Sequence, residues 1–390
     1  MTLRSLCDNQ RRATPGIPDR GSAATLTTLA GAAVGRRRAG LAIGLACALL
    51  TGCGDRGPTS LPSIGMPTAN LPSSAPRTFG QTFAPIGSAG AVESGQPIAS
   101  NPPASPGRPV TIHATRLDLR LPSPRSRAVA VLVGNQLLVC GGLLATGASS
   151  GSILAIDVSA GRVVDRGHLA SSVHDAGAAT LGALTLVVGG GRVGPGSAIQ
   201  RVTATGATTV GQLPVPRADL GAVVLDGELI VIGGATSGRP DRRVLATTDG
   251  VRFRTVATLR VGVRYAAVVT LGGRAYVIGG ATPTGDVNLI QAIDPRTGEV
   301  RIVGHLPTSL SHASALVVGG AILIAGGRQA GRALATLLRL DPATGSVTRI
   351  GRLPYATSDA AAIVVDGVGY LIGGEGGAGL LSTIIALTAT

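Results

Sequence analysis

Residues 353–374 read LPYATSDAAAIVVDGVGYLIGG and contain every element of a β-hairpin. The apolar runs 360–365 and 368–372 have the length and composition of short strands. Between them, Asp366 and Gly367 form a dipeptide that accepts the positive φ angles of a tight turn. The second run ends in a pair of glycines, Gly373 and Gly374. This stretch therefore predicts two antiparallel strands joined by a two-residue turn.

The same pattern occurs six times along the chain, and the first glycine of the pair always stands 20 positions after a leucine. The six leucine and glycine positions are Leu121 and Gly141, Leu169 and Gly189, Leu213 and Gly233, Leu259 and Gly279, Leu306 and Gly326, and Leu353 and Gly373. The glycine pairs recur after 44 to 48 residues. Units of this size cannot bury a hydrophobic face alone, so we expect them to pack against one another.

A double glycine that closes a hairpin strand, in repeats of this length, resembles the Kelch repeat of β-propellers. Two further segments, 294–298 and 341–345, each contain Asp-Pro followed by Thr-Gly and look like the turn between a blade's third and fourth strands. The chain departs from the family pattern in having no Trp. The resemblance covers residues 110–390 and implies an all-β, six-bladed propeller with four-stranded blades.

The repeat arithmetic also predicts how the ring closes. In the first blade we expect strands at 128–133, 136–140, 152–157 and 162–168. After Gly374 only residues 380–390 remain, which is room for a third strand but not a fourth. Residues 111–121 form an unpaired strand that ends in Leu-Pro, as the outer strands of later blades do. We therefore expect this N-terminal strand to join the last blade and cover its free edge.

The residues before the propeller predict export. Residues 1–33 have no structural pattern, and we expect translation to start near Val34. In residues 34–52, three arginines precede a 12-residue apolar run, which is typical of a secretory signal and shorter than the roughly 20 residues that span a bilayer. The ending Leu-Thr-Gly-Cys resembles a bacterial lipobox, which implies that Cys53 is lipidated and anchors an extracytoplasmic lipoprotein to the cell membrane. Residues 53–109 carry 11 of the 24 prolines and predict a disordered linker.

Charge and cysteine usage narrow the possible functions. The net charge is +14, but no stretch after Arg38 concentrates arginines as a nucleic-acid arm would, so we expect no nucleic-acid partner. Cys140 stands where the other repeats have apolar residues and is expected in the core. The five histidines lack metal-ligand spacing, and no helix follows the glycine runs, so we expect neither a metal nor another cofactor.

Polar residues gather in the loops that enter each blade, which meet around the central channel of a propeller. Six residues after each leucine stand Arg127, Asp175, Asp219, Tyr265, His312 and Asp359. With neighbours in the same loops, the predicted binding rim consists of Arg125, Arg127, His174, Asp175, Arg217, Asp219, Arg264, Tyr265, His312 and Asp359. The alternative is that these side chains only bond loop backbone or a neighbouring blade.

Two functions fit this rim. The first is a monomeric binding or scaffold module at the cell envelope, whose partner is a protein or a polysaccharide. The second is a carbohydrate-active enzyme, because the resembled propellers include a sialic acid mutarotase; Asp175, Asp219, His312 and Asp359 would then carry the acid and base chemistry. Copper radical chemistry, known in other Kelch-type propellers, would need a Tyr cross-linked to Cys, and Cys140 lies on an apolar strand.

Overall fold

A computed structural model describes residues 111–390, which consist of strands and connecting loops. The predicted signal segment 34–52, the predicted lipidation site Cys53 and the predicted linker 53–109 lie outside the described residues. Across the described part of the chain, no helix is long and apolar enough to cross a membrane.

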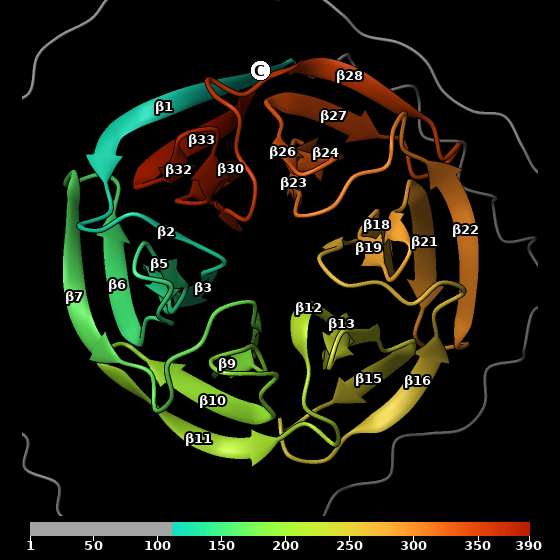
Figure 1. The fold of residues 1–390 in the computed structure, drawn as a ribbon, viewed down its shortest axis with the longest axis horizontal. Helices are drawn as coiled ribbons and strands as arrows, with labels where there is room; N and C mark the ends of the chain where they lie inside the picture. The colour runs from blue at the N-terminus through green and yellow to red at the C-terminus, as the bar shows by residue number, and fades with distance from the viewer. Residues whose placement is uncertain (1–110) are drawn as a thin grey trace, which may run out of the picture. The chain divides into compact units, whose positions relative to one another are not determined.

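Six four-stranded antiparallel sheets stand around a central axis as the blades of a propeller (Figure 1). From the axis outward, the first blade contains β3 (Val129–Val133), β4 (Gln136–Cys140), β6 (Ser152–Asp157) and β7 (Arg162–His168). The second contains β8 (Gly177–Leu181), β9 (Leu184–Val188), β10 (Ala198–Thr203) and β11 (Gly206–Gln212). The third contains β12 (Ala218–Leu225), β13 (Glu228–Thr236), β15 (Arg243–Thr247) and β16 (Arg254–Thr258).

The remaining blades follow the same order. The fourth contains β17 (Ala267–Leu271), β18 (Arg274–Ile278), β21 (Leu289–Asp294) and β22 (Glu299–His305). The fifth contains β23 (Ser314–Val318), β24 (Ala321–Ala325), β27 (Thr336–Leu340) and β28 (Val347–Arg352). The sixth contains β29 (Ala361–Val365), β30 (Val368–Ile372), β33 (Thr383–Ala389) and β1 (Ile112–Arg120).

Short two-residue strands pair within the loops at one end of the blades. They are β2 (Arg125–Ser126), β5 (Leu143–Leu144), β14 (Arg239–Pro240), β19 (Ala281–Thr282), β20 (Gly285–Asp286), β25 (Arg328–Gln329), β26 (Arg332–Ala333), β31 (Glu375–Gly376) and β32 (Gly379–Leu380). The residue six positions after each repeat leucine is called the ring position. In all six blades the residue before the ring position pairs with the residue after the glycine pair. The loop that enters a blade is thereby tied to the loop between its second and third strands.

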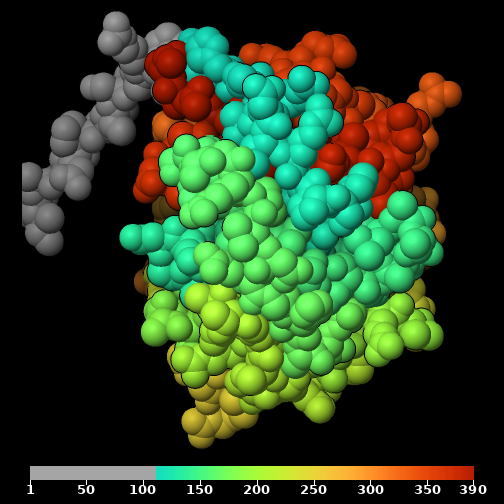
Figure 2. Space-filling view, turned by 90° about the vertical axis from the view of Figure 1, so that its left-hand side faces the viewer, coloured from blue at the N-terminus to red at the C-terminus, as the bar shows by residue number. Residues whose placement is uncertain are grey.

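The N-terminal strand closes the ring, as the repeat arithmetic predicts. β1 pairs antiparallel with β33, with Ile112 opposite Ala389 and Arg116 opposite Ile385. Figure 2 shows the residues of β1, in cyan, packed against the red C-terminal residues. The predicted strands of the first blade are also confirmed, with β3 starting one residue later than expected. The turns at 294–298 and 341–345 separate the third and fourth strands of their blades.

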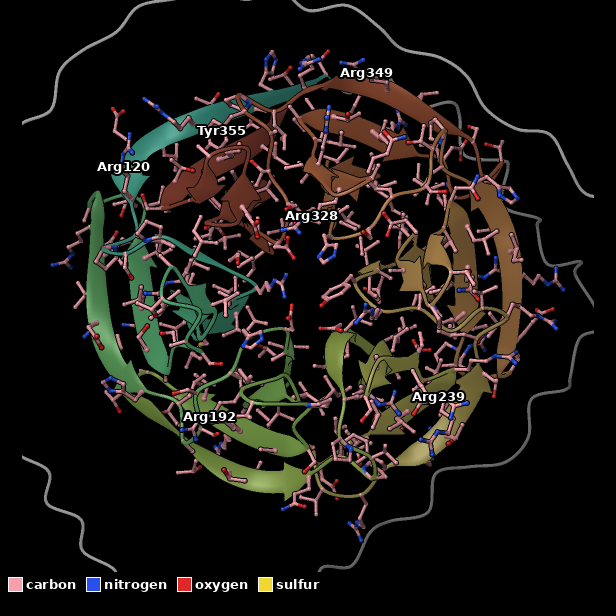
Figure 3. All side chains as sticks on the ribbon, in the orientation of Figure 1. Arg120, Arg192, Arg239, Arg328, Arg349 and Tyr355 are labelled. Atoms are coloured by element: carbon pink, nitrogen blue, oxygen red, sulfur yellow. The ribbon has the colours of Figure 1, made fainter. Side chains whose placement is uncertain are left out.

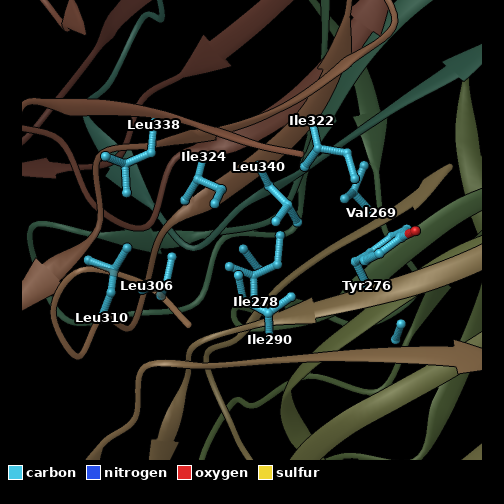
Figure 4. Packing of buried hydrophobic residues seen from close by; sticks show 12 residues of the cluster. Val269, Tyr276, Ile278, Ile290, Leu306, Leu310, Ile322, Ile324, Leu338 and Leu340 are labelled. Atoms are coloured by element: carbon cyan, nitrogen blue, oxygen red, sulfur yellow. The ribbon is translucent and has the colours of Figure 1, made fainter. Parts of the chain in front are cut away.

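The hydrophobic core is divided into six clusters, and each lies between two neighbouring blades. Figure 4 shows the cluster between the fourth and fifth blades, where Tyr276 and Ile278 face Ile322 and Ile324. The cluster between the sixth and first blades joins residues from both ends of the fold. Cys140 is buried in the cluster between the first and second blades, as predicted, and burial raises the pKa of its thiol to about 12.

The glycine pairs mark where one blade touches the next. Gly233 has a φ of +64°, and a Cβ atom built on it would lie 2.6 Å from the carbonyl oxygen of Val263 in the following blade. The amide of Gly234 donates a hydrogen bond to that same oxygen at 3.0 Å. Equivalent bonds, from the second glycine to the next blade, occur at all six contacts. The glycine pairs recur at the same spacing because each lies at a backbone contact between blades that leaves no room for a side chain.

Candidate functional site

The six residues at the ring position form a closed circle around the axis, here called the inner ring: Arg127, Asp175, Asp219, Tyr265, His312 and Asp359. Each amide donates a hydrogen bond to the carbonyl of the preceding blade's member, at 2.8 to 3.1 Å. The sixth bond, from the amide of Arg127 to the carbonyl of Asp359, completes the circle at 2.8 Å. One residue from each blade is thereby held at the same level around the axis.

All six inner-ring residues adopt the left-handed backbone conformation, with φ between 54° and 62°. Asp tolerates this conformation, but it is uncommon for Arg127 and Tyr265. The hydrogen bonds between blades hold the backbone in place whichever side chain it carries. Strained conformations of this kind gather at functional sites, which directs attention to the side chains.

A cavity of about 140 Å³ is lined by the inner ring and by the residue that follows each member. Beneath it, a second cavity of about 200 Å³ is lined mainly by Ala and Gly of the innermost strands. The two cavities share five lining residues, Ala176, Leu220, Ala266, Ala313 and Ala360. The first cavity is smaller than the roughly 300 Å³ at which sites for drug-sized ligands begin. It therefore suits a small group or one end of a longer molecule.

On one side of the inner ring, Asp359 is the centre of a hydrogen-bonded network. Nδ1 of His312 donates to Oδ1 of Asp359 at 2.6 Å, and the Ser358 hydroxyl donates to Oδ2 at 2.8 Å. Nη2 of Arg328 lies 3.0 Å from Oδ2 of Asp359 and 2.5 Å from Oε2 of Glu375. Arg328 comes from the fifth blade and both carboxylates from the sixth, so this network joins two blades. Figure 3 shows Arg328 on the inner side of the ring of blades.

On the opposite side, two carboxyl groups from adjacent blades lie next to two arginines. Nη1 of Arg127 donates to Oδ2 of Asp175 at 3.0 Å. Nη1 of Arg264 lies 3.6 Å from Oδ2 of Asp219. His174 faces this group as well, with Nε2 3.7 Å from Oδ2 of Asp175 and Nδ1 2.8 Å from the Ser149 hydroxyl oxygen. Acidic and basic side chains thus both face the cavity, and Asp175 and Asp219 are neighbours in the inner ring.

An aromatic pair lies between these two groups. The rings of Tyr265 and His312 stack with centroids 3.8 Å apart. The guanidinium groups of Arg127 and Arg264 lie 5.6 Å and 5.1 Å from the Tyr265 centroid, within cation–π range. Burial raises the pKa of Tyr265 to about 12, and the charges of Asp175 and Asp219 add to this. The Tyr265 hydroxyl is therefore protonated at neutral pH and can donate a hydrogen bond.

The two sides of the ring shift their carboxyl pKa values in opposite directions. Burial raises the pKa of Asp175 to about 7, partly offset by Arg127 and reinforced by the charges of Asp219 and Asp359. Burial also raises the pKa of Asp219, against Arg264 and hydrogen bonds from Tyr265 and Asp175. For Asp359, burial is outweighed by the His312 hydrogen bond and by the charges of His312, Arg127 and Arg328, so its pKa lies below the usual range. Asp175 can therefore exchange a proton near neutral pH while Asp359 stays ionised.

The structure corrects two members of the predicted rim. Arg217 is 0% exposed, and its guanidinium bonds the carbonyls of Gly233 and Arg243 and the carboxylate of Asp241. Arg125 is 3% exposed and bonds the carbonyl of Gly141 and the hydroxyl of Ser152. Both side chains point into the blade rather than to the channel. They are structural and cannot meet a partner.

The other predicted rim residues lie at or beside the cavity. The six inner-ring members line it, and His174 and Arg264 contact the carboxylates of Asp175 and Asp219. Many of their polar atoms bond the neighbouring blade, as the alternative interpretation expected. Among residues 111–390, His, Cys, Asp and Glu form no group of three or more suited to a metal ion.

Arg328 and Glu375 belong to the site but are not part of the predicted rim. Both occupy the position directly after a glycine pair, where the other four blades have Leu143, Gly191, Ala235 and Ala281. They are the only charged residues at that position. The sequence predicts both in the loops between second and third strands, which gather on the same face as the entering loops. Their pairing with the residue before the ring position brings them to the site.

Comparison with known proteins supports the same architecture. Residues 309–354, the fifth blade with its entering loop, match the Kelch motif. The solved structure of YjhT resembles the chain with a TM-score of 0.60 and 12% sequence identity, over 70% of this chain and 99% of that one. At this identity the likeness concerns the fold alone. A comparison with curated proteins gave no match.

The fold and the arrangement of its repeats define a six-bladed β-propeller with a polar channel mouth. Within this propeller, the fifth blade matches the Kelch motif.

Proposed function

We propose that the inner-ring cavity binds a sugar, either free or at the end of an envelope polysaccharide. The observation that carries this proposal is the mixture of donors and acceptors around a small cavity. Asp175, Asp219 and Asp359 offer acceptor oxygens, and Arg127 and Tyr265 offer donors. Sugar hydroxyls both donate and accept hydrogen bonds, so a ring of mixed polarity suits them better than a single-sign pocket.

The inner-ring carboxylates are buried, which favours a narrow ligand over a protein surface. The side chains of Asp175 and Asp359 are only 8% and 3% exposed. A flat protein face would not reach them, whereas a single sugar unit entering along the axis would. We therefore favour a polysaccharide partner over a protein partner.

The second part of the proposal concerns location. We propose that Cys53 carries lipid and that residues 53–109 tether the propeller outside the membrane. The support is the order of arginines, apolar run and Leu-Thr-Gly-Cys in the sequence. Metabolic labelling with an alkyne fatty acid tests it: we expect labelling of the wild type and none of Cys53→Ser. Equal labelling of both proteins would contradict the anchor.

The binding proposal is tested with a glycan array followed by calorimetry on the full chain. We expect Asp219→Asn combined with Asp359→Asn to weaken sugar binding at least tenfold, because two acceptors lose their charge. Asn tolerates the left-handed conformation, so the ring backbone is retained. Asp226→Asn is the matched control, since Asp226 also has a positive φ but lies in the first hairpin turn of the third blade, away from the cavity. Sugar binding that survives in the double variant, or is absent from the wild type, would refute the proposal.

The opposed pKa shifts of Asp175 and Asp359 favour a second candidate, an enzyme of the sialic acid mutarotase type. Opening a sugar ring requires one group to protonate the ring oxygen and another to take the proton of the anomeric hydroxyl, while the ring C–O bond breaks. Asp175, with a pKa of about 7, can supply the proton. His312 can accept the other proton when its imidazole is neutral, because Nδ1 then donates to Asp359 and the lone pair is on Nε2. Closure on the opposite face reverses both transfers.

Anomer exchange of N-acetylneuraminic acid, followed by NMR, tests this candidate. We expect acceleration by the wild type with a dependence on a group of pKa near 7, and a loss of about 100-fold or more in Asp175→Asn. Asp226→Asn should behave as the wild type. If the sugar binds but its exchange is not accelerated, the binding function stands and the enzymatic one is refuted.

A further inference from the structure

The cavity beneath the inner ring, here called the lower cavity, continues the inner-ring cavity along the axis. Its volume is about 200 Å³. The five residues that line both cavities each directly follow an inner-ring member, one in each of the second to sixth blades. Because these residues surround the axis at one level and border both cavities, the two cavities meet there. A ligand that enters through the inner ring can therefore reach the lower cavity with one end.

The wall of the lower cavity consists of the free edges of the innermost strands. In each blade the innermost strand pairs with one neighbour in its sheet, and its other edge faces the axis (Figure 1). A free strand edge presents backbone N–H and C=O groups that no strand bonds. The wall is therefore rich in backbone donors and acceptors, although most of its side chains are apolar.

The strand register identifies which backbone groups face the axis. In the second blade, Leu181 and Leu184 flank the two-residue turn between β8 and β9 and so form a hydrogen-bonded pair. Because such pairs alternate along an antiparallel ladder, Ala178 and Val187 form a non-hydrogen-bonded pair. The N–H and C=O of Ala178 consequently point away from β9 and toward the axis. The same register places four further lining residues in this orientation, Ala222, Val268, Ala315 and Ala362.

The lining of the lower cavity favours a polar group without charge. All of its residues are Ala, Gly, Val, Leu or Ser. The hydroxyl of Ser314 donates to the carbonyl of Ala360 at 3.2 Å, which shows that an axis-facing carbonyl accepts a donor here. Buried backbone groups are nearly always paired, so the remaining ones need water or a ligand as partner. An ion would lose its hydration in this cavity without gaining a counter-charge.

The depth of the channel indicates the size of the group that can reach this level. Asp175 and Ala178 are three positions apart, which corresponds to about 10 Å along a strand. A sugar ring held at the inner ring spans this depth when it carries one short arm. An acylamino arm has an N–H donor, a C=O acceptor and no charge, and it ends in a methyl group that can pack on alanine side chains.

We propose that the lower cavity binds an acylamino arm and that the ligand of the channel mouth is an N-acetylated amino sugar. This inference rests on the proposed function, because the sugar ring itself is held by the inner ring. The amide N–H of the arm donates to an axis-facing backbone carbonyl, and the amide C=O accepts from an axis-facing N–H. The acetyl methyl group packs among the alanines of the innermost strands.

Calorimetry on the full chain with matched sugars tests the inference. The three pairs are glucose and N-acetylglucosamine, galactose and N-acetylgalactosamine, and mannose and N-acetylmannosamine. We expect the N-acetyl member of at least one pair to bind about tenfold more tightly than its hexose, because the arm adds two hydrogen bonds. The corresponding free amine, which is charged, should bind no more tightly than the hexose. Hexose binding without an N-acetyl preference would refute this inference and leave the proposed function intact, whereas a chain that binds no sugar would refute both.

A variant that enlarges the lower cavity tests where the arm lies. Val268→Ala removes two methyl groups from the lining, and the fold accepts Ala there because four other blades have it at this position in the lining. We expect the N-butanoyl analogue of the bound sugar to gain about fivefold relative to the N-acetyl sugar in this variant. Val269→Ala is the matched control, since it removes the same atoms from the next residue, which packs between the fourth and fifth blades. If Val268→Ala keeps the wild-type ratio as Val269→Ala should, the arm does not enter the lower cavity and the inference is wrong.

Discussion

The glycine pairs and the inner ring lie side by side in every blade, and both join neighbouring blades through backbone hydrogen bonds. They differ in sequence. The glycine pair is the same in all six blades, whereas the inner ring has Arg, Tyr, His and three Asp. At a glycine such as Gly233 an added Cβ would collide with the next blade, so no other residue fits. At the ring position the backbone makes the contact and the side chain faces the channel.

Positions that are the same in every repeat, such as the glycine pairs, are therefore the places where blades contact each other. Positions that differ between repeats, such as the inner ring, are the places where a ligand can bind. A propeller can therefore keep its architecture while its channel mouth changes. This division between framework and ring can be tested by substitution, first in the framework and then in the ring.

The largest effect is expected from removing the closing strand. Without residues 112–120, β33 loses its hydrogen-bonded neighbour and the last blade exposes a sheet edge. We expect loss of the cooperative melting transition and aggregation, measured by circular dichroism and light scattering. A chain lacking residues 54–109 instead is the control and should melt as the wild type does. Equal melting of the two truncated chains would contradict the role of β1.

The next effect is expected at a glycine pair. Gly233→Ala places a methyl group against the carbonyl of Val263 and also forces a positive φ on alanine, so we expect a loss of about 3 kcal/mol or more in the free energy of unfolding. Gly272→Ala is the matched control, because Gly272 has a similar φ with no atom near the added Cβ. It should cost only about 1–2 kcal/mol. Urea unfolding of both variants measures the difference, and equal losses would show that the contact between blades is unimportant.

A smaller effect is expected in the ring, from Asp359→Asn. The change weakens the bonds with His312 and Arg328, for which we expect about 1–3 kcal/mol at pH 7. Because the pKa of Asp359 lies below its usual range, its contribution is present above the unfolded pKa of about 4 and lost as the pH falls through the folded value. The gap between wild type and variant in urea unfolding should therefore close below pH 4. A gap that stays constant with pH would contradict the ionised state of Asp359.

The last substitution, Asp175→Asn, should have its smallest effect at low pH. Near pH 4 both proteins carry a neutral side chain of the same shape in the fold, so their stabilities should be nearly equal. The raised pKa of Asp175 means that its stabilising contribution is present below about pH 4 and is lost as the pH rises through about 7. Between pH 4 and 8 the variant should therefore gain stability relative to the wild type. Parallel stability curves across this range would show that Asp175 titrates normally.

Much of the fold follows from sequence because it depends on backbone requirements that repeat. The 20-residue spacing, the turn glycines and the leftover strand at 111–121 predict the blades and their closure. The six-residue offset also predicts which residues surround the channel. Each of these regularities is a steric demand that every blade must meet.

The details of the site follow less well, because side-chain direction differs from blade to blade. The charge of Arg125 and Arg217 predicts a place on the rim, although Val173, Val263 and Leu310 occupy the same position in other blades and are buried. The apolar residues at this position predict that its side chain is buried. Both arginines are buried there and bond backbone carbonyls. Which ring members pair with each other depends on side-chain length and on contacts across blades. Spacing alone does not determine either.

The closed circle of backbone hydrogen bonds also shapes the electric field at the channel mouth. Each inner-ring amide bonds the carbonyl of the preceding member, so these N–H and C=O dipoles follow one another around the axis and largely cancel across it. A helix end, in contrast, presents a fixed partial charge to whatever approaches it. At this mouth the backbone adds almost no preference for anions or cations. The charge that a ligand meets at the channel mouth is therefore set by the side chains of the ring and of the loops beside it.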